Sequence, residues 1–222
     1  MLAVVVALFA SSLLFGVWDA FNPGDTHSVG YVAFGLVGLW IGFIGVPVHA
    51  ARRKGSGSVV EDFGLRLVPV DAALGVAGAL VATTAEAIVV AIIRTLSGPV
   101  KVTQDVGDTI KKAHGAELLA AFVLTVVAVP VVEELFFRGL LLRSLTRRIP
   151  PAAAVVVSAV VFGFAHYQGD VSGRIAMTVV AGLFVVGIVL GTLAHATRRL
   201  GPGIVAHALF NLLAFVSLVS SR

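Results

Sequence analysis

The chain has 222 residues, of which 58% are hydrophobic and 13% are charged, and its mean hydropathy is +1.02. A soluble domain carries about a quarter charged residues, so this chain has too few charges to cover a soluble surface, and its hydrophobicity excludes a disordered protein. One membrane helix takes roughly 20 apolar residues. The composition therefore predicts an all-α, polytopic membrane bundle of about seven transmembrane helices, within a range of six to eight.

The charge balance is basic, with 16 Lys and Arg side chains against 12 Asp and Glu, a net charge of +4. In a soluble protein this excess would suggest nucleic-acid binding. Here the basic residues flank apolar runs, which predicts a topology signal and contact with the lipid bilayer, and no nucleic acid. The chain contains no cysteine, which excludes disulfides, thiolate metal sites and a cysteine nucleophile.

Seven apolar segments follow one another, and we expect them to form a single integral-membrane domain over residues 1–222 with a motif core at 115–219. The first segment lacks a positively charged leader and a small-residue cleavage site, so we expect a retained helix and not a signal peptide. The segments are 2–18, 29–50, 71–93, 115–142, 151–168, 173–195 and 202–219.

The positions of Lys and Arg predict a multi-pass protein of the cell membrane with its N-terminus in the cytoplasm and its C-terminus outside. With this orientation, nine basic residues fall in inner loops and five in outer loops. The inner set is Arg52, Arg53, Lys54, Arg66, Arg143, Arg147, Arg148, Arg198 and Arg199, and the outer set is Arg94, Lys101, Lys111, Lys112 and Arg174.

Glu133, Glu134 and Arg138 lie close together in the fourth apolar segment, where charge is costly unless it is paired or hydrated. Glu134 and Arg138 are four residues apart and share one helix face, whereas Glu133 points about 100° away. Pro130 removes one backbone hydrogen bond a turn earlier and can kink the helix. These residues are candidates for a site, and the alternative is a buried ion pair that holds two helices together.

Two later segments also carry polar side chains. His166 ends the run Phe162-Gly163-Phe164-Ala165-His166, and His207 and Asn211 lie one turn apart on one face. Each of these alone could be a packing residue or an interhelical hydrogen bond. At about 1.5 Å per residue from the expected inner helix ends, Glu133 and His166 lie about 21 and 22 Å deep, Asn211 about 15 Å and His207 about 9 Å.

The three patterns occur in the order Glu-Glu-x-x-x-Arg, Phe-x-x-x-His and His-x-x-x-Asn on successive membrane helices. This order resembles the CPBP intramembrane proteases, the family of the type II CAAX prenyl endopeptidases and the bacterial Abi or bacteriocin-immunity-type proteins. The resemblance is concentrated in residues 130–211. It implies an intramembrane endopeptidase that hydrolyses a peptide bond in a hydrophobic or lipid-modified peptide or membrane-protein substrate.

The resemblance also implies roles for the first motif. Glu133 would be the general base that activates a water molecule. Glu134, tied to Arg138, would shape the site and tune that base.

The same resemblance implies that His166 binds or polarises the water, and that His207 and Asn211 stabilise the oxyanion. An imidazole and an amide one turn apart can present N–H donors to one oxyanion. The family has been described both as metalloproteases and as glutamate-dependent enzymes without a metal. No cofactor is certain: a zinc ion held by Glu133, His166 and His207 is an open alternative, and we favour the metal-free attack.

Two rival functions use the same residues differently. In a non-catalytic membrane immunity or partner protein, the polar residues would only hold helices together. In a small-solute carrier, Glu86 and Glu133 would relay protons, and Glu86 is an intramembrane acid that none of the motifs includes.

Overall fold

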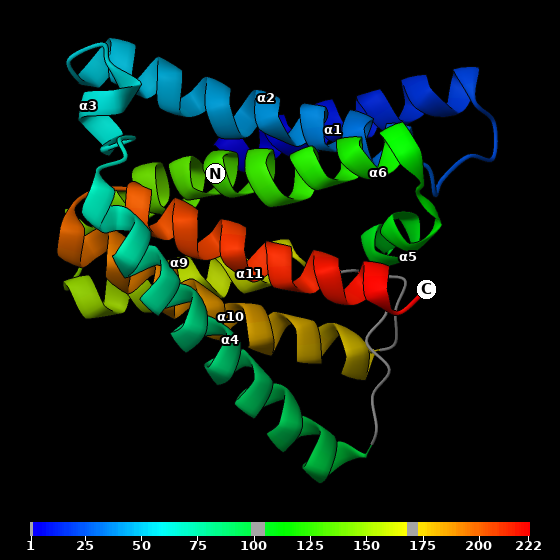
Figure 1. Cartoon of the computed structure of the whole chain (residues 1–222). Coiled ribbons are helices and arrows are strands. Elements are labelled where there is room, and N and C mark those ends of the chain that lie inside the picture. Colours follow the sequence, from blue (N-terminus) through cyan, green and yellow to red (C-terminus); the bar gives the residue numbers. More distant parts are fainter. Residues whose placement is uncertain (1, 99–104, 168–172) are drawn as a thin grey trace. The chain divides into compact units, whose positions relative to one another are not determined.

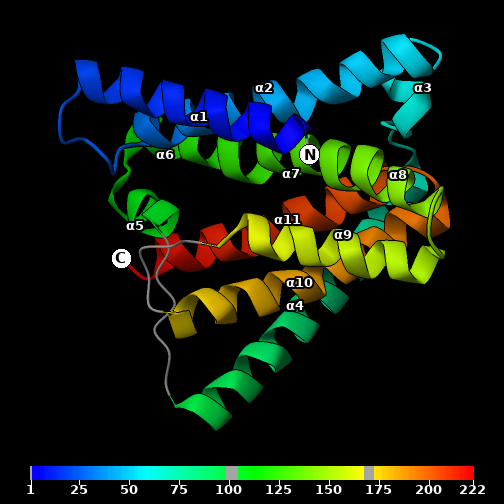
Figure 2. The ribbon, with the colours of Figure 1, turned by 180° about the vertical axis from the view of Figure 1, so that it is seen from behind.

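The computed structural model describes residues 2–98, 105–167 and 173–222 (Figures 1 and 2). Their regular structure is entirely helical, with no strand among the described residues. Six helices are long and apolar enough to cross a membrane, which confirms the prediction of an all-α membrane fold. These candidate spans are Val4–Phe21, Val29–Lys54, Pro69–Ser97, Gly115–Thr146, Gly173–Thr197 and Gly201–Ser220.

The fifth predicted segment, 151–168, is shorter than the other spans. It forms helix α9, Pro151–Ala165, of 15 residues, which is about 22 Å at the helical rise, against a hydrocarbon thickness of about 30 Å. The long spans therefore number six in the described part of the chain. Residue 168 lies outside the described residues, as does Lys101 of the expected outer loop.

Two short helices lie in the connections between spans: α3 (Val59–Phe63) and α5 (Asp105–Lys112). The polar composition of the connection before residue 115 gave no reason to expect α5. The described residues group into two compact units, and the single domain expected over residues 1–222 remains a prediction. Unit 1 comprises Met1–Asp62, Gln104–Phe136 and Asn211–Arg222, and unit 2 comprises Phe63–Thr103 and Phe137–Phe210.

In unit 1, helices α1 (Leu2–Phe21) and α2 (Val29–Lys54) lie side by side along their length (Figures 1 and 2). Glycine makes this possible, because a Cβ at Gly38 would overlap the backbone of Ser11. The Ser11 hydroxyl donates to the Gly35 carbonyl at 3.0 Å. Gly45, on the same helix, has no neighbour within 4 Å of where its Cβ would lie. Small residues thus bring these two helices close together at specific positions.

In unit 2, helix α10 (Gly173–Thr197) lies beside both α9 and α4 (Pro69–Ser97). Gly187 of α10 opposes the backbone and side chain of Ala159, and Gly191 opposes Val155, both on α9. The Gly-x-x-x-Gly pattern of this segment therefore provides the close approach between α9 and α10.

A buried ion pair fixes the start of α4 in unit 2. The carboxylate of Asp71 is fully buried and accepts from Arg199 Nη2 at 2.6 Å and from Arg199 Nε at 3.2 Å. Its other oxygen accepts the N–H of Val68 at 3.0 Å. A Cβ at Gly201 would overlap that oxygen. The pair thus holds the turn between α10 and α11 (Gly201–Ser220) against the start of α4.

We predict opposite effects for two glycine-to-alanine changes on α2. Gly38→Ala destabilises the protein by about 1–3 kcal/mol, because the added methyl group meets backbone that cannot rotate away. Gly45→Ala is neutral or stabilising by at most about 1 kcal/mol, because alanine favours the helix and has space there. Thermal unfolding of the purified variants in detergent measures both. Equal effects of the two changes would contradict the packing described here.

Candidate active site

The helix Gly115–Thr146 carries the two adjacent glutamates, and its hydrogen-bond pattern changes along its length. Pro130 lies in a five-residue α-helical segment with a π-helical segment on either side, and the kink expected there stays a prediction. Such segments are rare and occur frequently at functional sites. The order is α6 (Gly115–Phe122), η1 (Val123–Ala128), α7 (Val129–Glu133), η2 (Glu134–Leu142) and α8 (Arg143–Thr146).

Pro130 explains where the π-helical pattern of η1 ends. The N–H of Val129 donates to the carbonyl of Leu124, five residues back. The next bond in this register would join residue 130 to the Thr125 carbonyl, but proline has no N–H to donate. The side-chain amide of Asn211 donates to that Thr125 carbonyl instead, at 2.8 Å. Asn211 therefore replaces, from α11, the backbone donor that Pro130 removes.

This contact gives Asn211 a structural partner inside unit 1. One hydrogen of its amide is used on the Thr125 carbonyl, and an asparagine amide carries two hydrogens. The geometry thus provides the interhelical hydrogen bond considered for this residue. Its expected role at an oxyanion remains a prediction that uses the second hydrogen.

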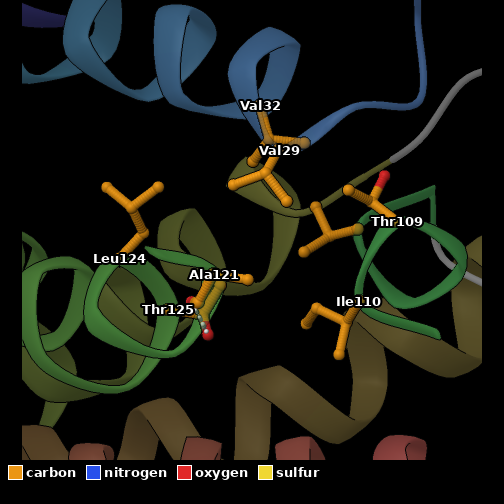
Figure 3. A pocket seen from close by; sticks show the side chains of 8 residues that line it. Val29, Val32, Thr109, Ile110, Ala121, Leu124 and Thr125 are labelled. Atoms are coloured by element: carbon orange, nitrogen blue, oxygen red, sulfur yellow. Dashed lines mark hydrogen bonds between the residues drawn. The ribbon is translucent and has the colours of Figure 1, made fainter. Parts of the chain in front are cut away.

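A small apolar cavity lies beside Thr125 in unit 1, as Figure 3 shows. Its volume is about 10 Å³, roughly the space that one water molecule needs. It is lined by Val29, Val32, Val106, Thr109, Ile110, Ala121, Leu124 and Thr125. None of the predicted site residues lines it, and it is too small for a peptide substrate.

In unit 2, the ring of Phe162 brings three of the predicted site residues together. The guanidinium carbon of Arg138 lies 4.3 Å from the centre of this ring, within the range of a cation–π contact. The rings of His166 and His207 lie 4.8 and 5.8 Å away between centroids. Phe137 packs edge-on against the same ring at 5.1 Å. We call these five residues the Phe162 cluster.

Phe162, at the centre of this cluster, is the first residue of the Phe-x-x-x-His pattern. That pattern did not indicate the role of the phenylalanine. Phe162 is fully buried and lies four residues before His166, so both face the same side of α9. His207 contacts α9 at Phe162. Phe162 lies one helical turn nearer to the start of α9 than His166 does. The i, i+4 spacing of Phe162 and His166 was the available signal.

The hydrogen bond of His166 fixes which nitrogen of its ring carries the proton. Its Nδ1 lies 2.9 Å from the carbonyl oxygen of Phe162. Since a carbonyl only accepts, Nδ1 must be the donor, and in the neutral imidazole Nε2 is then an acceptor. In a neutral His166, Nε2 is therefore the nitrogen that accepts hydrogen bonds.

Burial separates the candidate residues into two groups. The side chains of Glu134, Arg138 and His207 are buried, with 0%, 1% and 3% of their surface exposed. The other three, Glu133, His166 and Asn211, are partly exposed. Glu133 and Glu134 are adjacent, but they lie on opposite sides of the junction between α7 and η2. The structure thus gives two neighbouring carboxylates different environments.

The candidate residues belong to both compact units. Unit 1 contains Glu133, Glu134 and Asn211, and unit 2 contains Arg138, His166 and His207. Over residues 2–98, 105–167 and 173–222, no three His, Cys, Asp or Glu side chains are grouped so as to hold a metal ion. The alternative of a zinc ion held by Glu133, His166 and His207, which belong to different units, stays a prediction.

The fold and these residues define the class of protein. It is a multi-pass integral membrane protein whose later helices carry buried and half-buried ionisable side chains. Residues 115–213 match the family model described as type II CAAX prenyl endopeptidase, Rce1-like. The chain therefore carries an Rce1-like domain of the CAAX prenyl endopeptidase (CPBP/Abi) family over these residues. Neither a curated protein nor a solved structure matches the chain.

We predict that Asn211 and Pro130 are energetically coupled. Asn211→Ala leaves the Thr125 carbonyl without the amide and destabilises the protein by about 0.6–1.7 kcal/mol, the range of interhelical hydrogen bonds in membranes. In a Pro130→Ala background the restored N–H can donate to this carbonyl, so the same change costs less. Thermal unfolding of the four proteins of this double-mutant cycle measures the coupling. An equal cost in both backgrounds would contradict the proposed replacement of the backbone donor.

Proposed function

We propose that the protein is an intramembrane endopeptidase in which Glu133 activates a water molecule for attack on a peptide bond. The observation that carries this proposal is the family match over residues 115–213, because that range contains all three polar motifs. The order of these motifs on successive membrane helices also supports the proposal. Glu86 is an intramembrane acid that lies outside the match.

In the proposed reaction, Glu133 takes one proton from water while the water oxygen attacks the peptide carbonyl. His166, as an acceptor at Nε2, holds the other hydrogen of that water. The carbonyl becomes a tetrahedral oxyanion, and the bond to nitrogen breaks as Glu133 gives its proton to the leaving amine. The general base thus becomes the general acid, and no proton is gained or lost overall.

We propose that His207 and Asn211 donate to the oxyanion. Preorganised donors at a developing negative charge typically contribute a few kcal/mol to the rate. Asn211 can serve with the amide hydrogen that the Thr125 carbonyl does not use. His207 is almost fully buried and its ring is held edge-on to Phe162, which supports a fixed orientation for its donor.

Glu134 and Arg138 would act by shaping the site, and neither is proposed to react. Arg138 is held over the Phe162 ring and its Nη2 lies 3.4 Å from the Gly187 carbonyl of α10. A guanidinium is always charged and presents several donors in a fixed plane.

The proposed substrate is a hydrophobic or lipid-modified segment of a peptide or membrane protein, since a site at this depth is reached from the lipid or through a vestibule. We propose a metal-free reaction, because the sequence contains no His-Glu-x-x-His pattern and His207 is expected at a shallower depth than Glu133 and His166. Glu86 has no role in it: its side chain lies against Gly182 of α10, within unit 2. That position makes Glu86 a suitable control carboxylate.

We predict that Glu133→Gln abolishes peptide cleavage while the protein remains folded, because the amide has the shape of the carboxylate but cannot take a proton. The loss should be at least about 100-fold, the lower range for a general base. Glu86→Gln changes the same functional group in another membrane helix and should retain activity. Cleavage of a hydrophobic reporter peptide in detergent with a chelator present measures both variants. Full activity of Glu133→Gln would show that the polar residues are structural.

A second prediction concerns the distance between Glu133 and His166, which must share one water molecule. Because the chain has no cysteine, the double variant Glu133→Cys with His166→Cys carries the only two thiols. A short bifunctional thiol reagent should join them efficiently in the membrane. The matched control replaces Glu117 instead of Glu133, on the same helix but more than three turns away. Equal cross-linking of both pairs, or none with Glu133, would contradict the shared water.

A further inference from the structure

A second basic feature of unit 2 lies where two long helices end. A cavity of about 270 Å³ opens there, lined by Arg138, Leu142, Arg143, Thr146, Arg147, Ala194, His195 and Arg198. Four of these described residues are arginines and one is a histidine, and none is acidic. Apart from Arg138, none of them belongs to the Phe162 cluster.

The cavity lies at the expected level of the membrane surface. Thr146 is the last residue of one candidate span and Thr197 is the last residue of another. Arg147 and Arg198 follow them directly, and both are exposed. The ends of membrane-spanning helices lie among lipid headgroups, which is the level expected for these two arginines.

Backbone contacts hold the arginines around this cavity. Arg143 Nη2 donates to the carbonyl of Arg198 at 2.8 Å. Arg198 adopts a φ of 56°, the left-handed conformation that non-glycine residues rarely take. The next residue, Arg199, is fixed by its ion pair with buried Asp71. The turn after α10 is thus built so that Arg198 lines the same cavity as Arg147.

Topology alone does not require this convergence. The positive-inside rule needs basic residues near the helix ends, but it does not need them around a single cavity. Several like charges around one space repel each other. An anion inside the cavity would remove that repulsion and accept hydrogen bonds from several guanidinium groups.

We propose that this cavity binds the phosphate group of an anionic phospholipid. Guanidinium groups match phosphate oxygens in charge and in their planar pair of donors. The volume is close to the lower limit of about 300 Å³ for small-molecule sites, which suits a headgroup whose acyl chains remain in the bilayer. Basic pockets between membrane helices are known lipid-headgroup sites in general. The proposal is independent of the proposed peptidase function.

Two adjacent arginines provide a matched test. Arg147 lines the cavity, whereas Arg148 does not, and its Nη1 donates to the Ser144 carbonyl at 2.9 Å. Both are exposed, and glutamine at either position removes the same charge from the same helix end. The full-length protein in a neutral detergent is titrated with short-chain phosphatidylglycerol. We expect Arg147→Gln to weaken binding about tenfold, the effect of one charge-assisted hydrogen bond, and Arg148→Gln to change it less than twofold.

A second variant and two further ligands make the outcome unambiguous. Arg198→Asn also removes a cation from the cavity, and asparagine tolerates the left-handed conformation, so the turn is kept and binding should weaken as for Arg147→Gln. Short-chain phosphatidylcholine should bind weakly to every protein. If inorganic phosphate binds as tightly as phosphatidylglycerol with the same dependence on Arg147, the ligand is a free phosphate and the lipid source is wrong. Equal weakening by the Arg147 and Arg148 variants would overturn the site.

Discussion

The hydrocarbon core of a membrane contains no water that could donate to a backbone carbonyl that has lost its helical donor. Pro130 leaves such a carbonyl in the middle of a membrane helix. In a soluble helix the exposed carbonyl could bind solvent, but in a bilayer another part of the protein must supply the donor. Asn211 does so for the Thr125 carbonyl. The π-helical segments on both sides of Pro130 are consistent with this requirement, as is the place of Asn211, on the part of α11 that belongs to unit 1.

The same constraint governs the charged side chains. Arg138 is almost fully buried, and its guanidinium lies over the Phe162 ring. Asp71 has an arginine and a backbone N–H as partners. A desolvated ionic group is costly unless its hydrogen bonds and charge are compensated. Because such compensation needs partners from distant parts of the sequence, each deep charge also fixes how neighbouring helices pack within its unit.

The sequence predicted the features that follow from composition and local spacing. Runs of apolar residues located six long helices, and the Gly-x-x-x-Gly spacing of Gly187 and Gly191 is a local pattern that allows a close helix contact. The π-helical segments were not predictable, because hydrophobic periodicity does not distinguish a bond to the fourth residue from one to the fifth. The role of Phe162 was also missed, since an aromatic residue in an apolar helix gives no sign that cationic and imidazole groups will gather around it.

Asn211 links the defect in the helix to the proposed chemistry. An asparagine used only as an interhelical clamp could be replaced by any donor of similar reach, and a residue used only for an oxyanion would need another group to orient it. Here the bond to the Thr125 carbonyl uses one amide hydrogen and thereby fixes the direction of the other. The loss of a backbone N–H at Pro130, three residues before Glu133, thus provides the means by which an amide donor is oriented. A break in the helix that would be harmful in an ordinary membrane span is useful if Glu133 and Asn211 act as proposed, because that chemistry needs a rigid donor.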